Sequence, residues 1–221
     1  MAKKELKEDK FTEWMSGAFS FLKKRWKLVL RVLFCIVVIG GTLLLVSLRR
    51  SEKELSAMRV LNKGEVLFRE DKFSDAITIF EEVRRDFGNT KAGEIALIHI
   101  GESSCLLGEL DEAEGVFNEY LTEYPGREFS PRAQEGLGYV MEERGKFREA
   151  IDAYRKGYEN YPDSFLGPQA ILSIARCYEA MKEWSEAKEV YEEFLSLYPW
   201  SSSATLARAY LDVVEWEIAQ D

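Results

Sequence analysis

Few residues of this chain are of the types that carry out chemistry on a substrate. The 221 residues include one histidine, His99, and three cysteines, Cys35, Cys105 and Cys177, against 39 aspartates and glutamates. Acid–base and nucleophilic catalysis need a base within hydrogen-bond reach of a reacting group. No Gly-x-Ser-x-Gly, His-Glu-x-x-His or glycine-rich phosphate loop supplies such an arrangement. We therefore expect no enzyme activity.

The same residues give no reason to expect a metal or another cofactor. His99 has no cysteine or second histidine at ligand spacing. Three cysteines do not form a disulfide framework, and a free cysteine behaves as a small buried hydrophobe. The carboxylates follow the spacing of solvated helix faces. The chemistry that these residues support is binding.

A short box that returns at a fixed interval organises the chain. KFSDA at 72–76 is followed by ELDEA, KFREA and EWSEA, and the boxes end on alanines 37 residues apart. The positions that keep this register are Ala76, Ala113, Ala150 and Ala187; twelve residues earlier Gly64, Gly101, Gly138 and Ala175; four later Phe80, Phe117, Tyr154 and Tyr191; and twelve later Gly88, Pro125, Pro162 and Pro199. Self-similarity at such a period indicates an array of repeats.

Each position in the box has a mechanical reason. The small residues let two antiparallel helices approach closely, the aromatic residue one turn later fills the gap, and proline ends the second helix. We expect N-caps at Ser74, Asp111 and Ser185 for three of the second helices. We predict helix pairs at 52–70/74–86, 91–107/111–123, 131–145/148–160 and 168–182/185–197. One more amphipathic helix at 203–218, with Leu206, Tyr210, Val213, Val214 and Ile218, is expected to cover the open apolar end.

The spacing of glycine, alanine, aromatic residue and proline resembles the tetratricopeptide repeat (TPR), whose period is about 34 residues. The three extra residues fit in the connectors PGREFSP, PDSFLGP and PWSSSA. The resemblance covers residues 57–200 and implies a concave surface lined by the first helices, where a partner protein or extended peptide would bind. The candidate partner-contacting residues are Glu65, Phe68, Arg69, His99, Glu102, Arg132, Tyr139, Glu142, Arg176 and Glu179. Tyr139 and Arg176 are the strongest candidates because aromatic residues and arginine are enriched at binding hot spots.

The charge of the chain is divided unevenly. Residues 1–50 carry 11 Lys+Arg and 4 Asp+Glu, a net charge of +7. The other residues carry 19 basic and 35 acidic side chains, a net charge of −16. So acidic a repeat region repels phosphate backbones, and nucleic-acid binding is therefore not expected. An acidic surface that serves solubility and a preference for basic partners are both compatible with this balance.

An apolar run of 21 residues, 28–48, predicts a transmembrane helix. Fifteen of its residues are Leu, Ile, Val or Phe, and at 1.5 Å per residue it spans about 30 Å, the thickness of a bilayer core. The preceding residues, 1–27, are basic and carry a stripe of Phe11, Trp14, Met15, Ala18 and Leu22, which suits either a helix at the membrane surface or a disordered basic tail. Eight Lys+Arg before the span and five in residues 49–63 favour a cytoplasmic N-terminus and an exported repeat region.

These patterns predict an all-α protein with one transmembrane helix, a TPR solenoid of four helix pairs and a C-terminal capping helix. The expected parts are residues 1–27, 28–48, a helical connector 49–56, the repeats 57–200 and the cap 201–221. Segments such as NEYLTEYPGREFSP are similar to bacterial cell-envelope TPR proteins of the Tol–Pal-associated, outer-membrane assembly lipoprotein and translocon-associated types. This chain lacks the lipid-attachment signal, since Phe34 precedes Cys35.

The resemblance implies a protein–protein interaction scaffold in the inner membrane, with its repeats in the periplasm and no catalysis. Two alternatives stay open. One is a holdase-like chaperone or translocon accessory that binds unfolded segments, and the other is an anchored receptor whose repeats face the cytoplasm. Association between copies of the chain is also left open.

Overall fold

The computed structural model describes the backbone of residues 2–161 and 164–220, and the side chains of residues 14, 15, 25–161 and 164–220. All regular elements in these residues are α-helices. They are α1 (Ala2–Arg69), α2 (Phe73–Phe87), α3 (Lys91–Leu107), α4 (Leu110–Glu123), α5 (Ser130–Glu143), α6 (Phe147–Asn160), α7 (Gly167–Ala180), α8 (Trp184–Leu197) and α9 (Ala204–Ile218). The chain divides into two compact units, Met1–Glu52 and Lys53–Asp221.

The first unit consists of the N-terminal part of α1. The backbone leaves the helical region at Arg25 (φ −123°, ψ 22°), three residues before the apolar run. The apolar side chains of 28–48 are largely exposed, and by length and composition this is the one helix of the described residues that could cross a membrane. Trp14 and Met15 are exposed as well, whereas Phe11, Ala18 and Leu22 lie outside the described side chains.

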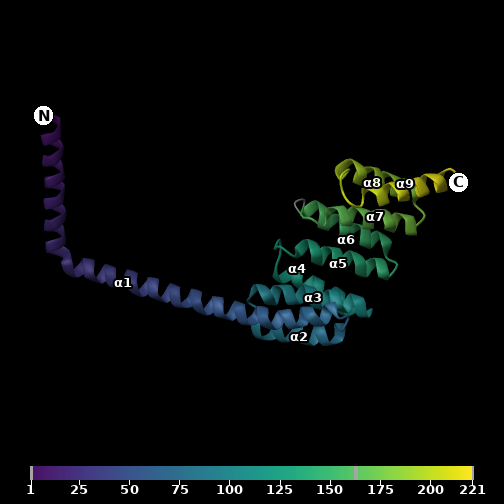
Figure 1. Ribbon diagram of the computed structural model, residues 1–221, viewed down its shortest axis with the longest axis horizontal. Helices are drawn as coiled ribbons and strands as arrows, with labels where there is room; N and C mark the ends of the chain where they lie inside the picture. The colour runs from purple at the N-terminus through teal and green to yellow at the C-terminus, as the bar shows by residue number, and fades with distance from the viewer. Residues whose placement is uncertain (1, 162–163, 221) are drawn as a thin grey trace. The chain divides into compact units, whose positions relative to one another are not determined.

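The second unit stacks helix pairs in chain order from α2 to α9 (Figure 1). The first pair consists of the end of α1 and α2, and α3/α4, α5/α6 and α7/α8 follow. The four box alanines, Ala76, Ala113, Ala150 and Ala187, are each 0% exposed. Because they are buried at equivalent places in four pairs, the predicted repeat is confirmed.

The small residues on the first helices are required by the aromatic rings of the second helices. A Cβ atom added to Gly101 would lie 2.6 Å from the Phe117 ring, and one added to Gly138 would lie 2.5 Å from the Tyr154 ring. Gly64 faces Phe80 in the same way. A glycine at the crossing thus lets a large ring fill the space between the two helices.

The turn within each pair explains why the predicted N-caps are wrong. The left-handed positions are Asp71, Gly108, Gly145 and Lys182, again 37 residues apart. After each of them, the next backbone N–H bonds to a carbonyl five residues earlier, for example from Lys72 to Leu67 at 3.0 Å. This is the Schellman arrangement, which ends the first helix. The residue that follows the left-handed position is also the N-cap of the second helix. The N-caps are therefore Lys72, Glu109, Lys146 and Glu183, and Ser74, Asp111 and Ser185 lie inside the first turns.

Helix α9 covers the end of the stack, although not with all of the predicted residues. Ala204, Ala207 and Val214 are buried and belong to the apolar cluster that contains Tyr191 and Phe194 of α8. Leu206, Tyr210 and Val213, which the sequence placed in the covering face, remain 52%, 43% and 55% exposed. The reason is that apolar residues occupy two sides of this helix, and only one side packs on α8.

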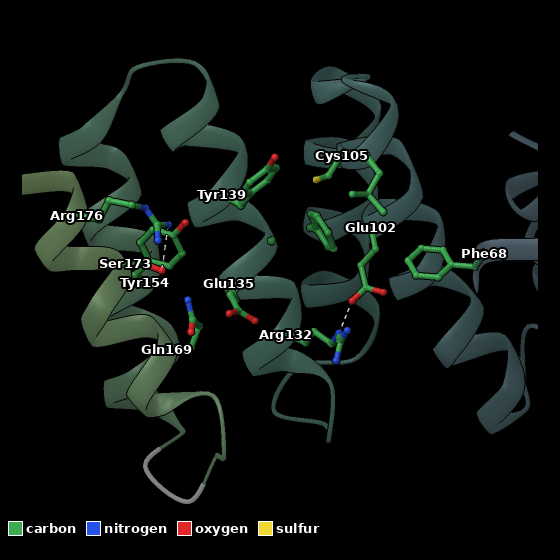
Figure 2. Close-up of a pocket in the computed structure, with 13 residues that line it drawn as sticks. Phe68, Glu102, Cys105, Arg132, Glu135, Tyr139, Tyr154, Gln169, Ser173 and Arg176 are labelled. Atoms are coloured by element: carbon green, nitrogen blue, oxygen red, sulfur yellow. Dashed lines mark hydrogen bonds and ion pairs between the residues drawn. The ribbon is translucent and has the colours of Figure 1, made fainter. Parts of the chain in front are cut away.

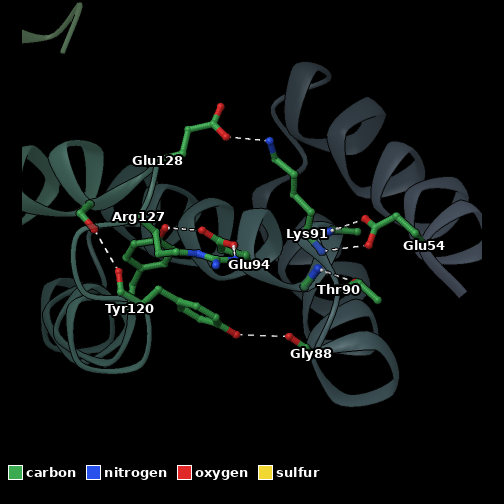
Figure 3. A network of polar contacts seen from close by, with 12 residues as sticks. Glu54, Gly88, Thr90, Lys91, Glu94, Tyr120, Arg127 and Glu128 are labelled. Atoms are coloured by element: carbon green, nitrogen blue, oxygen red, sulfur yellow. Dashed lines mark hydrogen bonds and ion pairs between the residues drawn. The ribbon is translucent and has the colours of Figure 1, made fainter. Parts of the chain in front are cut away.

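A polar network joins the first two repeats to the connector that follows them (Figure 3). The carboxylate of Glu54 accepts hydrogen bonds from the backbone N–H groups of Lys91 and Ala92, at 3.0 and 3.1 Å, at the start of α3. The buried carboxylate of Glu94 accepts bonds from Tyr120 Oη at 2.8 Å and Arg127 Nη2 at 2.9 Å. The network satisfies helix-end donors and holds successive repeats in register.

Candidate functional site

An open groove of about 350 Å³ lies across the first helices of the repeats, and we call it the central groove (Figure 2). Its lining comes from α1, α3, α5 and α7, with one ring each from α4 and α6. The lining residues are Phe68, Glu102, Cys105, Leu106, Phe117, Arg132, Glu135, Gly136, Tyr139, Tyr154, Gln169, Ser173 and Arg176. Apolar and aromatic groups thus alternate with a few charged ones, which is typical of a binding site.

The repeat register places the same positions of successive first helices in this groove. Arg132, Gly136 and Tyr139 line it from α5. The residues 37 positions later, Gln169, Ser173 and Arg176, line it from α7. The spacing i, i+4, i+7 puts each trio on one helix face, so the stacking of repeats aligns the two trios side by side.

Gly136, a further small residue on a first helix, lets the Phe117 ring of the second helix α4 reach the groove. A Cβ atom on Gly136 would lie 2.3 Å from Cζ of Phe117, so only glycine fits there without a shift. Phe117 is 1% exposed and lies between Gly101 of its own repeat and Gly136 of the next. It therefore forms a rigid apolar floor.

The wall between α3 and α5 is an ion-paired cluster. His99 Nδ1 lies 3.0 Å from Glu102 Oε2, and Arg132 forms an ion pair with the other oxygen of the same carboxylate. Burial alone would raise the pKa of Glu102, but the hydrogen bond with His99 and the charge of Arg132 bring it below its ordinary value. Glu102 is thus held as a carboxylate.

The wall on α7 depends on a second cluster. Arg176 donates from Nε to Glu142 Oε1 at 2.6 Å and from Nη2 to Oε2 at 2.8 Å, a bidentate pair. The hydrogen bond to Glu142 raises the pKa of Arg176, which keeps the guanidinium charged. Nη2 also lies 3.3 Å from Ser173 Oγ. The guanidinium therefore has a fixed position in the groove.

Two further ionisable groups face the groove without an ion pair to a described side chain. Glu135 is half-buried and forms none of the ion pairs or hydrogen bonds found among the described side chains. Burial raises its pKa, although the charge of Arg132 opposes the shift. Burial also raises the pKa of the Cys105 thiol to about 11, so this cysteine is not an activated nucleophile.

Half of the ten predicted contact residues lie in this groove. They are Phe68, Glu102, Arg132, Tyr139 and Arg176. His99 and Glu65 lie beside it, with His99 Nε2 3.7 Å from Glu65 Oε1. The remaining three have other surroundings. Glu142 forms the ion pair with Arg176, and Glu179 accepts a hydrogen bond from the Tyr191 hydroxyl at 2.9 Å. Arg69 is exposed and does not line the groove.

The sequence interpretation missed eight lining residues. They are Cys105, Leu106, Phe117, Glu135, Gly136, Tyr154, Gln169 and Ser173. The 37-residue register held a signal for Gln169, since it is the repeat equivalent of the predicted Arg132. For Phe117 and Tyr154 there was no comparable signal, because both belong to second helices and reach the groove only through the small residues opposite them.

Comparison with protein families identifies the repeats. Two family profiles described as Tetratricopeptide repeat match the chain, one over residues 61–128 and the other over 132–164 and 169–200. Together they cover more than half of the chain, which therefore belongs to the tetratricopeptide repeat family. No curated protein sequence matches the chain significantly.

Solved structures with the same fold come from several proteins. A MamA fragment from Desulfovibrio magneticus RS-1 is 15% identical, with a TM-score of 0.55 over 74% of this chain and 92% of that one. TPR-like repeats of a putative kinesin light chain from Podospora anserina are 14% identical, with a TM-score of 0.56 over 78% and 87% of the two chains. The apo form of RapI is 16% identical, with a TM-score of 0.63 over 73% and 48%. At these identities the likeness concerns the fold.

The fold and the site define a class of protein. TPR proteins generally mediate protein–protein interactions, and their scaffold is typically non-catalytic. Within the described residues, no group of three His, Cys, Asp or Glu is arranged to hold a metal ion. The central groove is thus suited to recognising a partner protein or peptide.

Proposed function

We propose that this protein is a membrane-anchored interaction scaffold of the bacterial cell envelope, which binds segments of partner proteins in the central groove. The observation that carries the proposal is the groove itself, where aligned trios on α5 and α7 surround an apolar floor. Tyr139, 37% exposed, offers an aromatic ring at its mouth. A partner segment would cover this ring and displace water from the floor, and such central, desolvated contacts supply most of the affinity at protein interfaces.

The ion pairs in the groove favour specificity. Because Arg132 and Arg176 are already held by Glu102 and Glu142, their positions are set before a partner arrives. Preorganisation lowers the entropy that binding must offset. A partner must therefore match the positions of these groups, which supports a scaffold with defined partners.

The anchor in this proposal is the apolar run 28–48, and the repeats are exported. The length of the run and its composition support insertion, and the excess of Lys and Arg before it supports a cytoplasmic N-terminus. A periplasm-active reporter fused after Asp221 tests the topology. Activity of the reporter is expected, and activity only of a cytoplasm-specific reporter would replace the scaffold with an anchored cytoplasmic receptor.

Photocrosslinking in intact cells tests the scaffold. A photoreactive amino acid is placed at Tyr139, and the matched control has it at Glu189, which is exposed on α8 and outside the groove lining. We expect one or a few discrete crosslinked proteins from position 139 and none of them from position 189. A broad smear of unrelated clients would favour a holdase, and identical products from both positions would contradict groove binding.

A further inference from the structure

Helix α9 leaves several large apolar side chains exposed, and three of them lie on one face of the helix. Leu206, Tyr210 and Val213 are 52%, 43% and 55% exposed, and their spacing i, i+4, i+7 puts them on one face. The adjacent side of the helix, roughly 90° around its axis, buries Ala207 and Val214 against the last repeat. We call the three exposed residues the α9 strip.

The α9 strip occupies the groove-lining positions of a fifth first helix. Its three residues lie 37 positions after Gln169, Ser173 and Arg176 of α7, all of which line the central groove. The Tyr210 ring stacks on the Tyr191 ring, with centroids 5.9 Å apart and planes at 28°. Tyr191 is the repeat equivalent of Tyr154, which reaches the groove. The strip therefore continues the groove side of the repeats.

The strip is not the surface on which another repeat helix of this chain would pack. That surface corresponds to Ile171, Ala175 and Tyr178 of α7, which face α8 and are buried or partly buried with it. The equivalent positions of α9 are Arg208, Asp212 and Glu215, and all three are exposed. Polar residues at these positions are typical of the outer face of a terminal cap. The α9 strip is therefore not a packing surface for a further repeat helix, and another molecule would have to cover it.

Charge indicates the kind of occupant. Glu135 lines the central groove without a hydrogen bond or ion pair from the described side chains. Burial and the charge of Glu102 raise the pKa of this carboxyl more than the charge of Arg132 lowers it, so the ionised form is destabilised on balance. Residues 51–221 have a net charge of −16. A cation supplied by the partner would stabilise Glu135 and complement the surrounding field.

We propose that the central groove and the α9 strip form one continuous site for a cationic partner segment, with a Lys or Arg at Glu135 and a large apolar residue on the strip. This inference rests on the proposed function and names the chemistry of its partner. Packed helices lie about 8–10 Å apart. Because α6 and α8 pack between the first helices, the two steps from α5 to α9 span at least about 20 Å. An extended chain needs at least about six residues to cover that length. The partner motif is therefore a basic and an apolar residue at least about six positions apart.

Selection from a random library tests the motif. Twelve-residue peptides displayed on phage are selected against the full-length protein in nanodiscs of zwitterionic lipid, after depletion on empty nanodiscs. The enriched peptides are expected to pair Lys or Arg with Leu, Ile, Phe or Trp at least about five positions away. Enrichment of acidic peptides, of basic peptides without the apolar residue, or of no peptide would overturn the proposal.

Matched variants test the two contacts separately. Leu206→Ser with Val213→Ser is expected to weaken binding of the enriched peptide at least about tenfold, whereas Leu197→Ser, an equally exposed leucine on α8, leaves it unchanged. Glu135→Gln is expected to weaken it about threefold to tenfold, and Glu189→Gln not at all. Equal binding to the wild-type protein and the strip variant would show that the strip plays no part.

Two other outcomes separate this inference from its alternatives. If sedimentation shows a dimer that the strip variant abolishes, and no peptide binds, the strip is an interface between copies and the proposal is wrong. If no peptide is enriched while crosslinking from position 139 still captures a discrete partner, this inference fails and the proposed scaffold stands. If both experiments fail, the scaffold fails too.

Discussion

The hydroxyl of Tyr154 donates a 2.8 Å hydrogen bond to Glu142, and the same bond recurs 37 residues later from Tyr191 to Glu179 at 2.9 Å. In the first two repeats the aromatic residue is Phe80 or Phe117 instead. The residue at the glutamate position is then Phe68 or Cys105. Repeats with tyrosine thus have glutamate at the facing position, because a buried hydroxyl requires a hydrogen-bond acceptor. Repeats with phenylalanine have Phe68 or Cys105 there, since the phenylalanine ring has no hydroxyl.

This pairing predicts unequal costs for removing the two glutamates. Glu142→Ala leaves both the Tyr154 hydroxyl and the Arg176 guanidinium without their acceptor, and we expect the free energy of unfolding to fall by about 2–3 kcal/mol. Glu179→Ala removes the acceptor of Tyr191 alone and should cost about 1 kcal/mol. Helical circular dichroism during denaturation of the full-length protein in detergent measures both. Equal losses would contradict the added role of Arg176.

The close helix crossing predicts opposite effects for two glycine-to-alanine substitutions. A Cβ on Gly138 would lie 2.5 Å from the Tyr154 ring, and since that ring is buried, Gly138→Ala should destabilise the protein by about 1–3 kcal/mol. Gly115, inside α4, has no neighbour within 4 Å of an added Cβ, so Gly115→Ala should stabilise it by about 0.5–1 kcal/mol. Thermal unfolding of both variants checks the signs, and a neutral Gly138→Ala would disprove the tight crossing.

The left-handed turn position predicts a stabilising glycine. Lys182 has φ 59°, whereas the repeat-equivalent Gly108 and Gly145 adopt the same region without a Cβ. We expect Lys182→Gly to raise the free energy of unfolding by about 0.5–1 kcal/mol, because a non-glycine residue is strained there. The control is Lys156→Gly in the interior of α6, which should lower stability by about 1 kcal/mol. Chemical denaturation distinguishes these outcomes, and a loss of stability in both variants would contradict the assigned strain.

The buried Glu94 and the half-buried Glu135 predict opposite pH dependences. The hydrogen bonds from Arg127 and Tyr120 outweigh burial and lower the pKa of Glu94, so its stabilising contribution is present above the ordinary value of about 4.3 and is lost as the pH falls through the folded value. Glu94→Gln should therefore destabilise the protein at pH 7 by about 1–3 kcal/mol, with a smaller difference in acid.

The pKa of Glu135 is shifted in the opposite direction from that of Glu94. Burial raises its pKa, so its ionised form opposes folding at pH 7, and this cost disappears below the ordinary value of about 4.3. Glu135→Gln should raise stability at pH 7 by up to about 0.5 kcal/mol and have no effect near pH 3.5. Thermal unfolding across pH 3.5–8 measures both variants. A destabilising Glu135→Gln at pH 7 would mean that a partner for this carboxylate exists in the folded protein.

The repeat unit could be predicted from the sequence because its determinants are local. Ala113 lies four residues before Phe117 and twelve after Gly101, so the helix pair and the crossing are contained within one period. The apolar run 28–48 is likewise local, and by length and composition it could cross a membrane. Fold class and helix order follow from such short-range patterns, and five of the ten candidate contact residues line the central groove.

Only the tertiary structure decided which neighbour packs against each helix face and which face stays exposed. The sequence cannot show that Glu142 holds Arg176 from the next repeat, or that Phe117 reaches the groove past Gly136, because these contacts join different repeats. It also did not separate the two apolar sides of α9, since a periodic pattern gives amphipathicity and not the side that a neighbour covers. Packing against the last repeat buries Val214 and leaves Val213 exposed, and Val213 is for this reason part of the α9 strip.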